Sequence, residues 1–225
     1  MPEIYELCNK YGKFTALDSL SMNISENSIF GFVGPNGAGK TTTMKIMAGL
    51  LKADSGSIFV NGEDILKNPK SIREKIGYMP DFFGVYDDLK VTEYMDFYAG
   101  MYYIPYADRP ELINNLLEIV DLSNKKDSYV DSLSRGMKQR LCLARSLIHD
   151  PDLLILDEPA SGLDPRARVE MKEILKRLKE MGKTIVISSH ILPELAEMCS
   201  EVGIIDQGRL VTQGTVTEIM NKIQK

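Results

Sequence analysis

The sequence predicts an α/β fold that combines a mostly parallel sheet, an N-terminal antiparallel β portion and an inserted helical subdomain. Short, continuously apolar runs alternate with helical patterns, which indicates parallel strands covered by helices on both faces. Asn61-Gly62 and Gln207-Gly208 each lie between strand-like runs and indicate antiparallel hairpins near the two ends of the chain. From Val91 to about His149 the pattern is helical only, which places the insert in the middle.

The individual elements follow from these patterns. We expect strands at 28–33, 57–60, 153–156 and 184–188, helices at about 40–50, 165–181 and 191–199, and a last strand pair around Gln207-Gly208. The helix at 165–181 has an apolar stripe that should face the core, formed by Met171, Ile174, Leu175, Leu178 and Met181. We therefore expect a single domain over 1–225, with a core of 1–89 and 150–225 and a helical subdomain at about 90–149.

The composition is typical of a globular domain and limits the classes of function. Hydrophobic residues make up 44% and charged residues 26% of the 225 residues. No run approaches the roughly 18–20 uncharged apolar residues that cross a bilayer, and the N-terminus has no signal-peptide pattern. The formal net charge of −5 disfavours a nucleic-acid partner. We expect the widely spaced Cys8, Cys142 and Cys199 to be buried thiols in a reducing compartment, not a disulfide framework or a zinc site.

The strongest signal is GPNGAGKTT at 34–42, which follows an expected strand and precedes an expected helix. Its spacing matches the loop that cradles nucleotide phosphates, so we expect a P-loop NTPase core. Glycines let several backbone N–H groups converge on an anion, and the helix start adds its positive end. We expect Lys40 to reach the β- and γ-phosphates, Thr41 to ligate Mg²⁺ and Thr42 to bond an earlier phosphate. The expected phosphate-binding residues are Gly34, Pro35, Asn36, Gly37, Ala38, Gly39, Lys40, Thr41 and Thr42.

Two acids, Asp157 and Glu158, follow the apolar run LLIL at 153–156. The carboxyl end of a strand is where open α/β sheets bind ligands. We expect Asp157 to hold Mg²⁺, directly or through water, and Glu158 to polarise an attacking water as general base. The pair is informative because a phosphate loop precedes it in the same chain.

With these motifs, the chain resembles the nucleotide-binding domain of ABC ATPases over essentially its whole length. LSRGMKQR at 133–140 is similar to the signature motif of that family, and SGLD at 161–164 is similar to its D-loop. His190 resembles the switch histidine, and Tyr11 resembles the aromatic residue that stacks on adenine. IGYMPD at 76–81 looks like the segment that opens the Q-loop.

The resemblance implies an ATP-hydrolysing motor subunit of a transporter. Ser134 and Gly136 of one subunit would contact the γ-phosphate of ATP on another, so that two subunits close head to tail around two ATP molecules. Asp164, in the D-loop, would belong to the same nucleotide site, and His190 would contact the γ-phosphate. The implied partners are a separate membrane permease and a second ATP-binding subunit, identical or different. The implied place is the cytoplasmic face of the membrane, and the implied direction is export.

Several of these residues also suit an ordinary structural role. Tyr11 could be a half-buried tyrosine, and His190 could simply begin a helix. Asp164 suits an N-cap before Pro165, which is compatible with the D-loop role. An aromatic cluster could either dock the permease or form the core of the helical subdomain. Its members are Phe82, Phe83, Tyr86, Tyr94, Phe97, Tyr98, Tyr102 and Tyr103.

The sequence departs from the family pattern at three positions. Asp81 stands where Gln is usual, and its carboxylate can ligate Mg²⁺ or orient water but adds negative charge beside the phosphates. Arg135 and Met137 replace the typical Gly and Gln of the signature motif.

Two other functions stay open at this point. One is a soluble ABC ATPase acting on ribosomes or DNA, for which tandem domains or coiled-coil insertions are expected. The other is a catalytically silent module that binds nucleotide, which only Asp81 favours.

Overall fold

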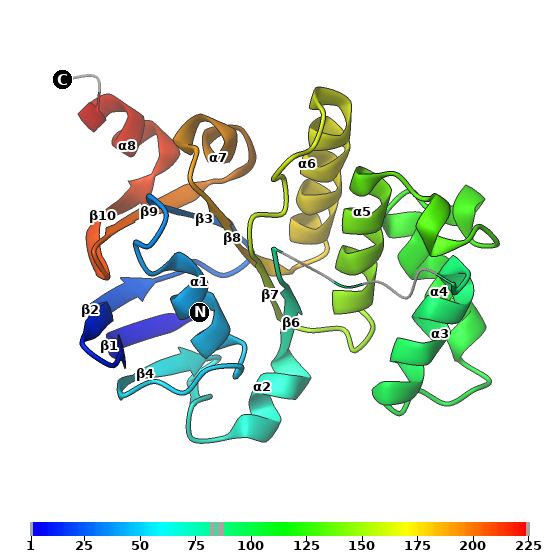
Figure 1. Cartoon of the computed structure of the whole chain (residues 1–225), viewed down its shortest axis with the longest axis horizontal. Coiled ribbons are helices and arrows are strands. Elements are labelled where there is room, and N and C mark those ends of the chain that lie inside the picture. The colour runs from blue at the N-terminus through cyan, green and yellow to red at the C-terminus, as the bar shows by residue number, and fades with distance from the viewer. Residues whose placement is uncertain (1, 82–83, 85–87, 224–225) are drawn as a thin grey trace.

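Two β-sheets lie beside a group of helices in the computed structural model, which describes residues 2–81, 84 and 88–223 (Figure 1). The smaller sheet is antiparallel and has the strand order β2-β1-β4-β5. Its strands are β1 (Glu3–Tyr11), β2 (Phe14–Asn23), β4 (Ser55–Val60) and β5 (Glu63–Asp64). The antiparallel β portion predicted for the N-terminus is therefore present.

The larger sheet has the order β10-β9-β3-β8-β7-β6. Its strands are β3 (Ile29–Val33), β6 (Ile76–Met79), β7 (Leu153–Leu156), β8 (Thr184–Ser189), β9 (Glu201–Asp206) and β10 (Arg209–Thr215). All neighbours pair in parallel except β10, which runs antiparallel to β9. The predicted mostly parallel sheet is thus confirmed.

Both predicted hairpin turns are present. Asn61 and Gly62 have φ of 52° and 78°, and Gln207 and Gly208 have φ of 46° and 76°. Two successive positive φ angles are the requirement of a type I′ turn, which joins antiparallel strands with the correct twist.

Both faces of the parallel sheet are buried, which explains the continuous apolar runs in the sequence. In β3, Phe30 and Phe32 point into a core shared with α1 (Lys40–Met47), α2 (Pro69–Lys75) and the antiparallel sheet. Ile29 and Val33 point into the core on the opposite face. Helices α5 (Arg135–Ser146), α6 (Pro165–Glu180), α7 (Leu192–Met198) and α8 (Val216–Ile223) contribute to that second core.

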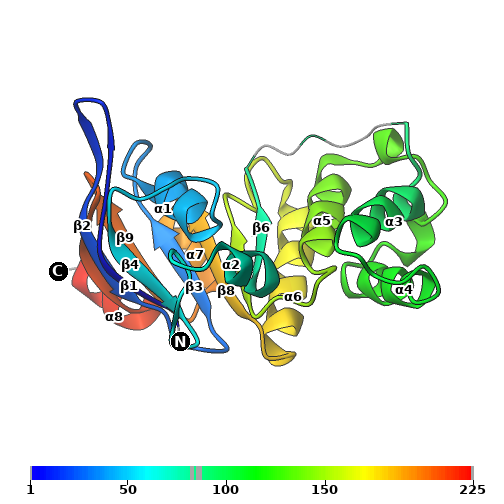
Figure 2. The same ribbon diagram turned by 90° about the horizontal axis from the view of Figure 1, so that it is seen from below.

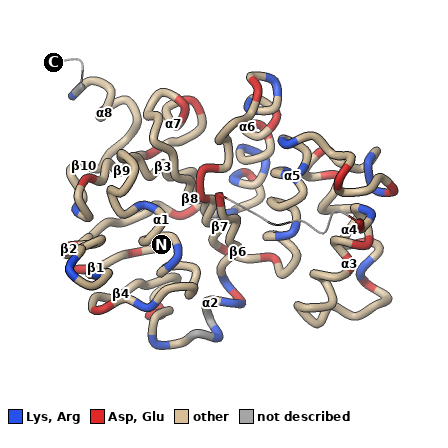
Figure 3. Tube along the Cα trace, viewed as in Figure 1, with Lys and Arg blue, Asp and Glu red and all other residues tan. Residues whose placement is uncertain are grey.

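The helical insert stands to one side of the sheets (Figure 2). It contains α3 (Val91–Met101), α4 (Arg109–Ile119), the 3-10 turns Ser123–Lys125 and Val130–Ser132, and α5. Ion pairs attach it to α6: Arg177 lies 2.7 Å from Asp121, and Arg140 lies 3.3 Å from Glu170. Lys/Arg and Asp/Glu positions are interspersed over these helices (Figure 3). None of the described helices is both long enough and apolar enough to span a lipid bilayer.

Most predicted elements lie within a few residues of their expected places, and the differences have local causes. Met181, predicted in the buried stripe of α6, is 56% exposed because the helix ends at Glu180. The prediction of three buried thiols is wrong for Cys8 and Cys199, which are only partly buried; Cys142 is buried. Strands β1 and β2 were not located individually, because irregular pairing breaks the alternation of side chains in both.

We expect Leu175→Ala to destabilise the fold far more than Val169→Ala on the same helix. Leu175 is fully buried, so truncation costs about 2–5 kcal/mol, whereas the change at Val169, which is 59% exposed, costs within about 0.5 kcal/mol. Urea unfolding of the two variants measures the difference. Equal midpoints would contradict this description of the core.

Candidate active site

The register of the parallel strands brings four chain segments to one edge of the sheet. Val33 pairs with Ser189, and Leu156 pairs with both Ile187 and Met79. The strands β3, β8, β7 and β6 therefore all end at the same edge. The residues that follow them, Gly34, His190, Asp157 and Pro80, begin the loops of the candidate site.

The phosphate loop runs from the end of β3 to the start of α1. A Cβ atom on Gly34 would lie 2.3 Å from the carbonyl oxygen of Ile205, so no larger residue fits there. Gly39 caps α1 with a φ of 109°, which L side chains rarely adopt. The first backbone N–H groups of a helix have no intrahelical partner, so the start of α1 can donate them to an anion.

Lys40 is the charged group at the centre of this loop. Its side chain is buried, and its Nζ donates hydrogen bonds to the carbonyl oxygens of Gly34 at 2.6 Å and Pro35 at 3.1 Å. An ammonium held by neutral carbonyls, away from water, can gain from a negatively charged oxygen. The loop can therefore receive an anion.

The Gln207-Gly208 hairpin supports the loop from behind. The amide of Gly208 donates to the carbonyl of Ala38 at 2.9 Å, and the amide of Asp18 donates to the carbonyl of Gly208 at 3.0 Å. Outside the loop, Arg209 forms an ion pair with Asp18 at 2.6 Å. The phosphate loop is thus held between β2 and the last hairpin of the chain.

The two acids after β7 differ in their surroundings. Asp157 is 1% exposed and accepts a 2.6 Å hydrogen bond from the Ser188 hydroxyl. The same hydroxyl accepts from the amide of Glu158 at 2.9 Å. Glu158 has a φ of 51°, an uncommon conformation for a non-glycine residue and one that clusters at functional sites.

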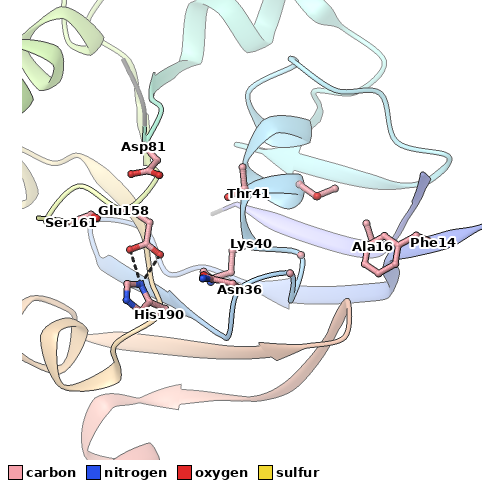
Figure 4. A pocket seen from close by; sticks show the side chains of 12 residues that line it. Phe14, Ala16, Asn36, Lys40, Thr41, Asp81, Glu158, Ser161 and His190 are labelled. Carbon is pink, nitrogen blue, oxygen red and sulfur yellow. Dashed lines mark hydrogen bonds and ion pairs between the residues drawn. The ribbon is translucent and has the colours of Figure 1, made fainter. Parts of the chain in front are cut away.

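Glu158 and His190 form a pair in the cleft (Figure 4). Nδ1 of His190 lies 3.3 Å and 3.2 Å from the two carboxylate oxygens. Burial raises the pKa of Glu158, while its hydrogen bond with His190 and the positive charge of Lys40 lower that pKa in part. His190 precedes α7, which begins at Leu192, so its ring is available to the cleft.

A cleft of about 350 Å³ joins these groups (Figure 4). The predicted residues that line it are Asn36, Gly37, Gly39, Lys40, Thr41, Thr42, Asp81, Glu158 and His190. Phe14 and Ala16, which also line the cleft, were not predicted, and Ser161 was named only as part of the D-loop motif, without a role at this cleft. The sequence contains one indication that Phe14 lies near this cleft: it is a second aromatic ring, three positions after Tyr11 and separated from it by a short turn. Phe14 is 58% exposed and pairs with Tyr11 across the hairpin.

The other predicted residues lie outside the lining of this cleft. Tyr11, at the end of β1, is 50% exposed. Ser134, Gly136 and Asp164 line a second hollow of about 510 Å³ at the start of α5 and α6. Asp164 is the N-cap of α6, accepting from the amide of Ala167 at 2.8 Å, so this part of its prediction is confirmed. Gly34, Pro35 and Ala38 belong to the phosphate loop but are not among the residues that line the cleft.

The donor set suits Mg²⁺ that arrives with a nucleotide. Thr41 and Asp81 supply a hydroxyl and a carboxylate to the cleft, whereas Asp157 is buried and is not part of the lining. Among the described residues, no three His, Cys, Asp or Glu side chains gather in a metal-binding group. Mg²⁺ commonly takes one or two protein ligands and completes its shell with phosphates and water. The residues present fit that mode.

The aromatic cluster divides between core and surface. Tyr94 is buried, whereas Phe97 and Tyr103 are 45% and 92% exposed. Phe82, Phe83 and Tyr86 lie outside the described residues.

The phosphate loop, the carboxylate–histidine pair and the parallel sheet define the class of the protein, which is a P-loop NTPase.

Comparisons with known proteins specify the family. Residues 17–161 match the family described as ABC transporter. The chain is 39% identical over 214 residues to Nod factor export ATP-binding protein I of Ralstonia nicotianae, covering 95% of this chain and 67% of that protein. It is 36% identical over 213 residues to the linearmycin resistance ATP-binding protein LnrL of Bacillus subtilis, covering 95% and 68%.

A solved structure agrees with this assignment. CbiO1 from Clostridium perfringens, described as part of the ABC transporter complex cbiONQ, superposes with a TM-score of 0.88 at 29% identity, covering 99% of this chain and 91% of that one. The chain belongs to the ABC transporter family, as an ATP-binding subunit that hydrolyses ATP to drive transport.

The acidic limb of the pH–rate profile should report Glu158. A general base works only when ionised, and burial raises the pKa of this carboxyl, so the rate should fall at a pH above the ordinary glutamate pKa of about 4.3. His190 lowers that pKa, so His190→Ala should move the midpoint of the limb to higher pH. Steady-state hydrolysis across pH measures both midpoints. An unchanged midpoint in His190→Ala would show that the pair does not control the limb.

Proposed function

We propose that this chain is the motor subunit of an ABC exporter. Two subunits close head to tail around two ATP molecules on the cytoplasmic face of the membrane, and their closure drives a separate permease. The observation that supports this proposal most directly is that one cleft holds both Lys40, within a phosphate loop, and the Glu158–His190 pair. Binding and cleavage of a terminal phosphate therefore have their groups in one place.

The residues of the cleft divide the work. Residues 34–42 hold the phosphates through backbone N–H groups, and Lys40 exchanges its loop carbonyls for phosphate oxygens. Thr41, Asp81 and Asp157 would hold a Mg²⁺ ion that arrives with the nucleotide. That ion would supply neutralisation of charge on the phosphate oxygens. The resemblance assigns Tyr11 to the adenine, and Phe14, which lines the cleft, adds a second ring on the same side.

Glu158 and His190 act on the reacting end of ATP. The ionised carboxylate of Glu158 accepts a proton from the attacking water as the water approaches the γ-phosphate. His190, held against that carboxylate, keeps it oriented and contacts the γ-phosphate. The raised pKa of Glu158 makes its carboxylate a stronger base than an ordinary exposed glutamate.

The second hollow receives the ATP of the other subunit. Ser134 and Gly136 lie there, at the start of α5, where backbone N–H groups and the helix dipole favour an anion. Asp164 lines the same hollow from the start of α6. Each ATP is thus enclosed by the cleft of one subunit and the hollow of the next, and its γ-phosphate decides whether the two stay together.

The proposed direction of transport, export, and the proposed membrane partner are supported by the names of the relatives. One relative is named for Nod factor export and another for linearmycin resistance, and CbiO1 is described as part of a transporter complex.

We assign the helical subdomain to residues 90–149 and the core to 1–89 and 150–225. The exposed ring of Phe97 is then available to a permease, whereas Tyr94 belongs to the subdomain core. The net charge of −5 gives no reason to expect a nucleic-acid partner.

Two substitutions should separate binding from cleavage. Lys40→Ala should weaken MgATP binding, because a buried charge that pairs with phosphate is lost. Glu158→Gln should leave binding intact but reduce hydrolysis by at least about 10²-fold, in the range of a lost general base, and trap an ATP-bound dimer. Calorimetry, phosphate release and sedimentation measure the three effects. Normal turnover in Glu158→Gln would remove Glu158 from the mechanism.

Phe14→Ala and Tyr11→Ala should each weaken ATP but not inorganic triphosphate. Removing a ring that stacks on a base costs about 1–3 kcal/mol, which is roughly 5- to 150-fold in affinity. Binding of both ligands to each variant gives the comparison, with inorganic triphosphate as the internal control because it has no base. If both ligands weaken equally, the rings act on the loop and not on a base.

A further inference from the structure

Arg135 lies against residues 161–164, the loop that joins the cleft at Glu158 and His190 to the second hollow. A Cβ atom built on Gly162 would be 2.5 Å from Cζ of Arg135, 2.6 Å from Nη1 and 2.8 Å from Nη2. Three nearly equal distances place the face of the guanidinium plane, and not its edge, over Gly162. Gly162 also has a φ of 66°, which L side chains rarely adopt, and a side chain at this position would displace the guanidinium of the exposed Arg135.

Two neighbouring contacts join the same pair of segments. Nε2 of Gln139, a buried residue of α5, donates to the carbonyl of Ser161 at 3.2 Å. A Cβ on Gly136 would lie 2.9 Å from Cβ of Ala167, so the first turns of α5 and α6 are in direct contact. The start of α5 therefore grips residues 161–164 and the helix that follows them.

Residues 161–164 belong to both hollows. Ser161 lines the ATP cleft of its own chain, and its amide donates to the carbonyl of Glu158 at 3.0 Å. Asp164, three residues later, lines the second hollow beside Ser134. If this loop is held to α5, any shift of the loop changes the cleft and the second hollow together.

We propose that Arg135 is a positioning residue that clamps residues 161–164 onto the start of α5, so that the ATP cleft and the second hollow of one chain form a single rigid unit. The proposal rests on the head-to-tail dimer proposed above, because only there does the second hollow receive a nucleotide. The resemblance described above places Arg135 where the signature motif typically has glycine.

The chemistry of the contact requires arginine. A planar, delocalised guanidinium is weakly hydrated and can lie flat on a glycine, whereas a lysine ammonium is compact and strongly hydrated. Lys at this position would keep the charge but lose the flat contact. This difference separates a clamp from a simple charge that attracts phosphate.

Dimer formation by the purified full chain tests the clamp. In a Glu158→Gln parent, the ATP concentration that gives half-maximal dimer should rise about tenfold, or about 1.4 kcal/mol, in Arg135→Gly and also in Gly162→Ala. The Kd of ATP for the monomer, measured at a protein concentration below dimerisation, should stay within twofold. Arg135→Lys should resemble Arg135→Gly, and Gly162→Ala should have a smaller effect in the Arg135→Gly background than in the parent.

Several results would overturn the proposal. These are an unchanged midpoint in Arg135→Gly, independent effects in the double variant, or full function in Arg135→Lys, which would identify a charge contact to phosphate. A parent that fails to bind ATP or to dimerise would instead contradict the proposed function. In that case hydrogen exchange still tests the clamp, because the amides of 161–164 should exchange faster in monomeric Arg135→Gly, and unchanged exchange would reject it.

Discussion

The parallel pairing of β3, β8, β7 and β6 is the constraint on which the site depends. The pairs Val33 with Ser189 and Leu156 with Ile187 and Met79 place the ends of four strands at one edge of the sheet. The phosphate loop, His190, the two acids and Asp81 belong to sequence segments that are far apart, and only this register gathers them. The apolar side chains of both faces are fully buried, so a slip of any strand would cost core burial as well as the site.

Three of the gathered charges, Lys40, Asp157 and Glu158, each have a partner in the protein. Lys40 is held by two carbonyls, Asp157 by Ser188, and Glu158 by His190. Buried charges without such partners would cost several kcal/mol, so these contacts lower the cost of burying Lys40, Asp157 and Glu158. The positive φ of Glu158 is a local strain that directs its carboxylate to His190 and the cleft.

The sequence predicts those features that depend on a short stretch of backbone. The phosphate loop, the apolar strands LLIL and TIVIS, and both type I′ turns need particular residue types in a particular order, and all are found where expected. Features made by distant segments are not predictable in this way. Phe14 reaches the cleft from the start of β2 and Ser161 from the loop after β7, and Arg135 meets Gly162 only because α5 and α6 pack together. Met181 shows the same limit, since its exposure depends on where α6 ends.

The central claim is that the triphosphate lies between residues 34–42 and the Glu158–His190 pair. A crystal structure of the Glu158→Gln chain with MgATP tests this claim most directly. The account predicts that the Lys40 ammonium leaves the carbonyls of Gly34 and Pro35 for the β- and γ-phosphates, and that the γ-phosphate faces residue 158 and His190. A triphosphate bound elsewhere, with Lys40 still on its two carbonyls, would contradict it.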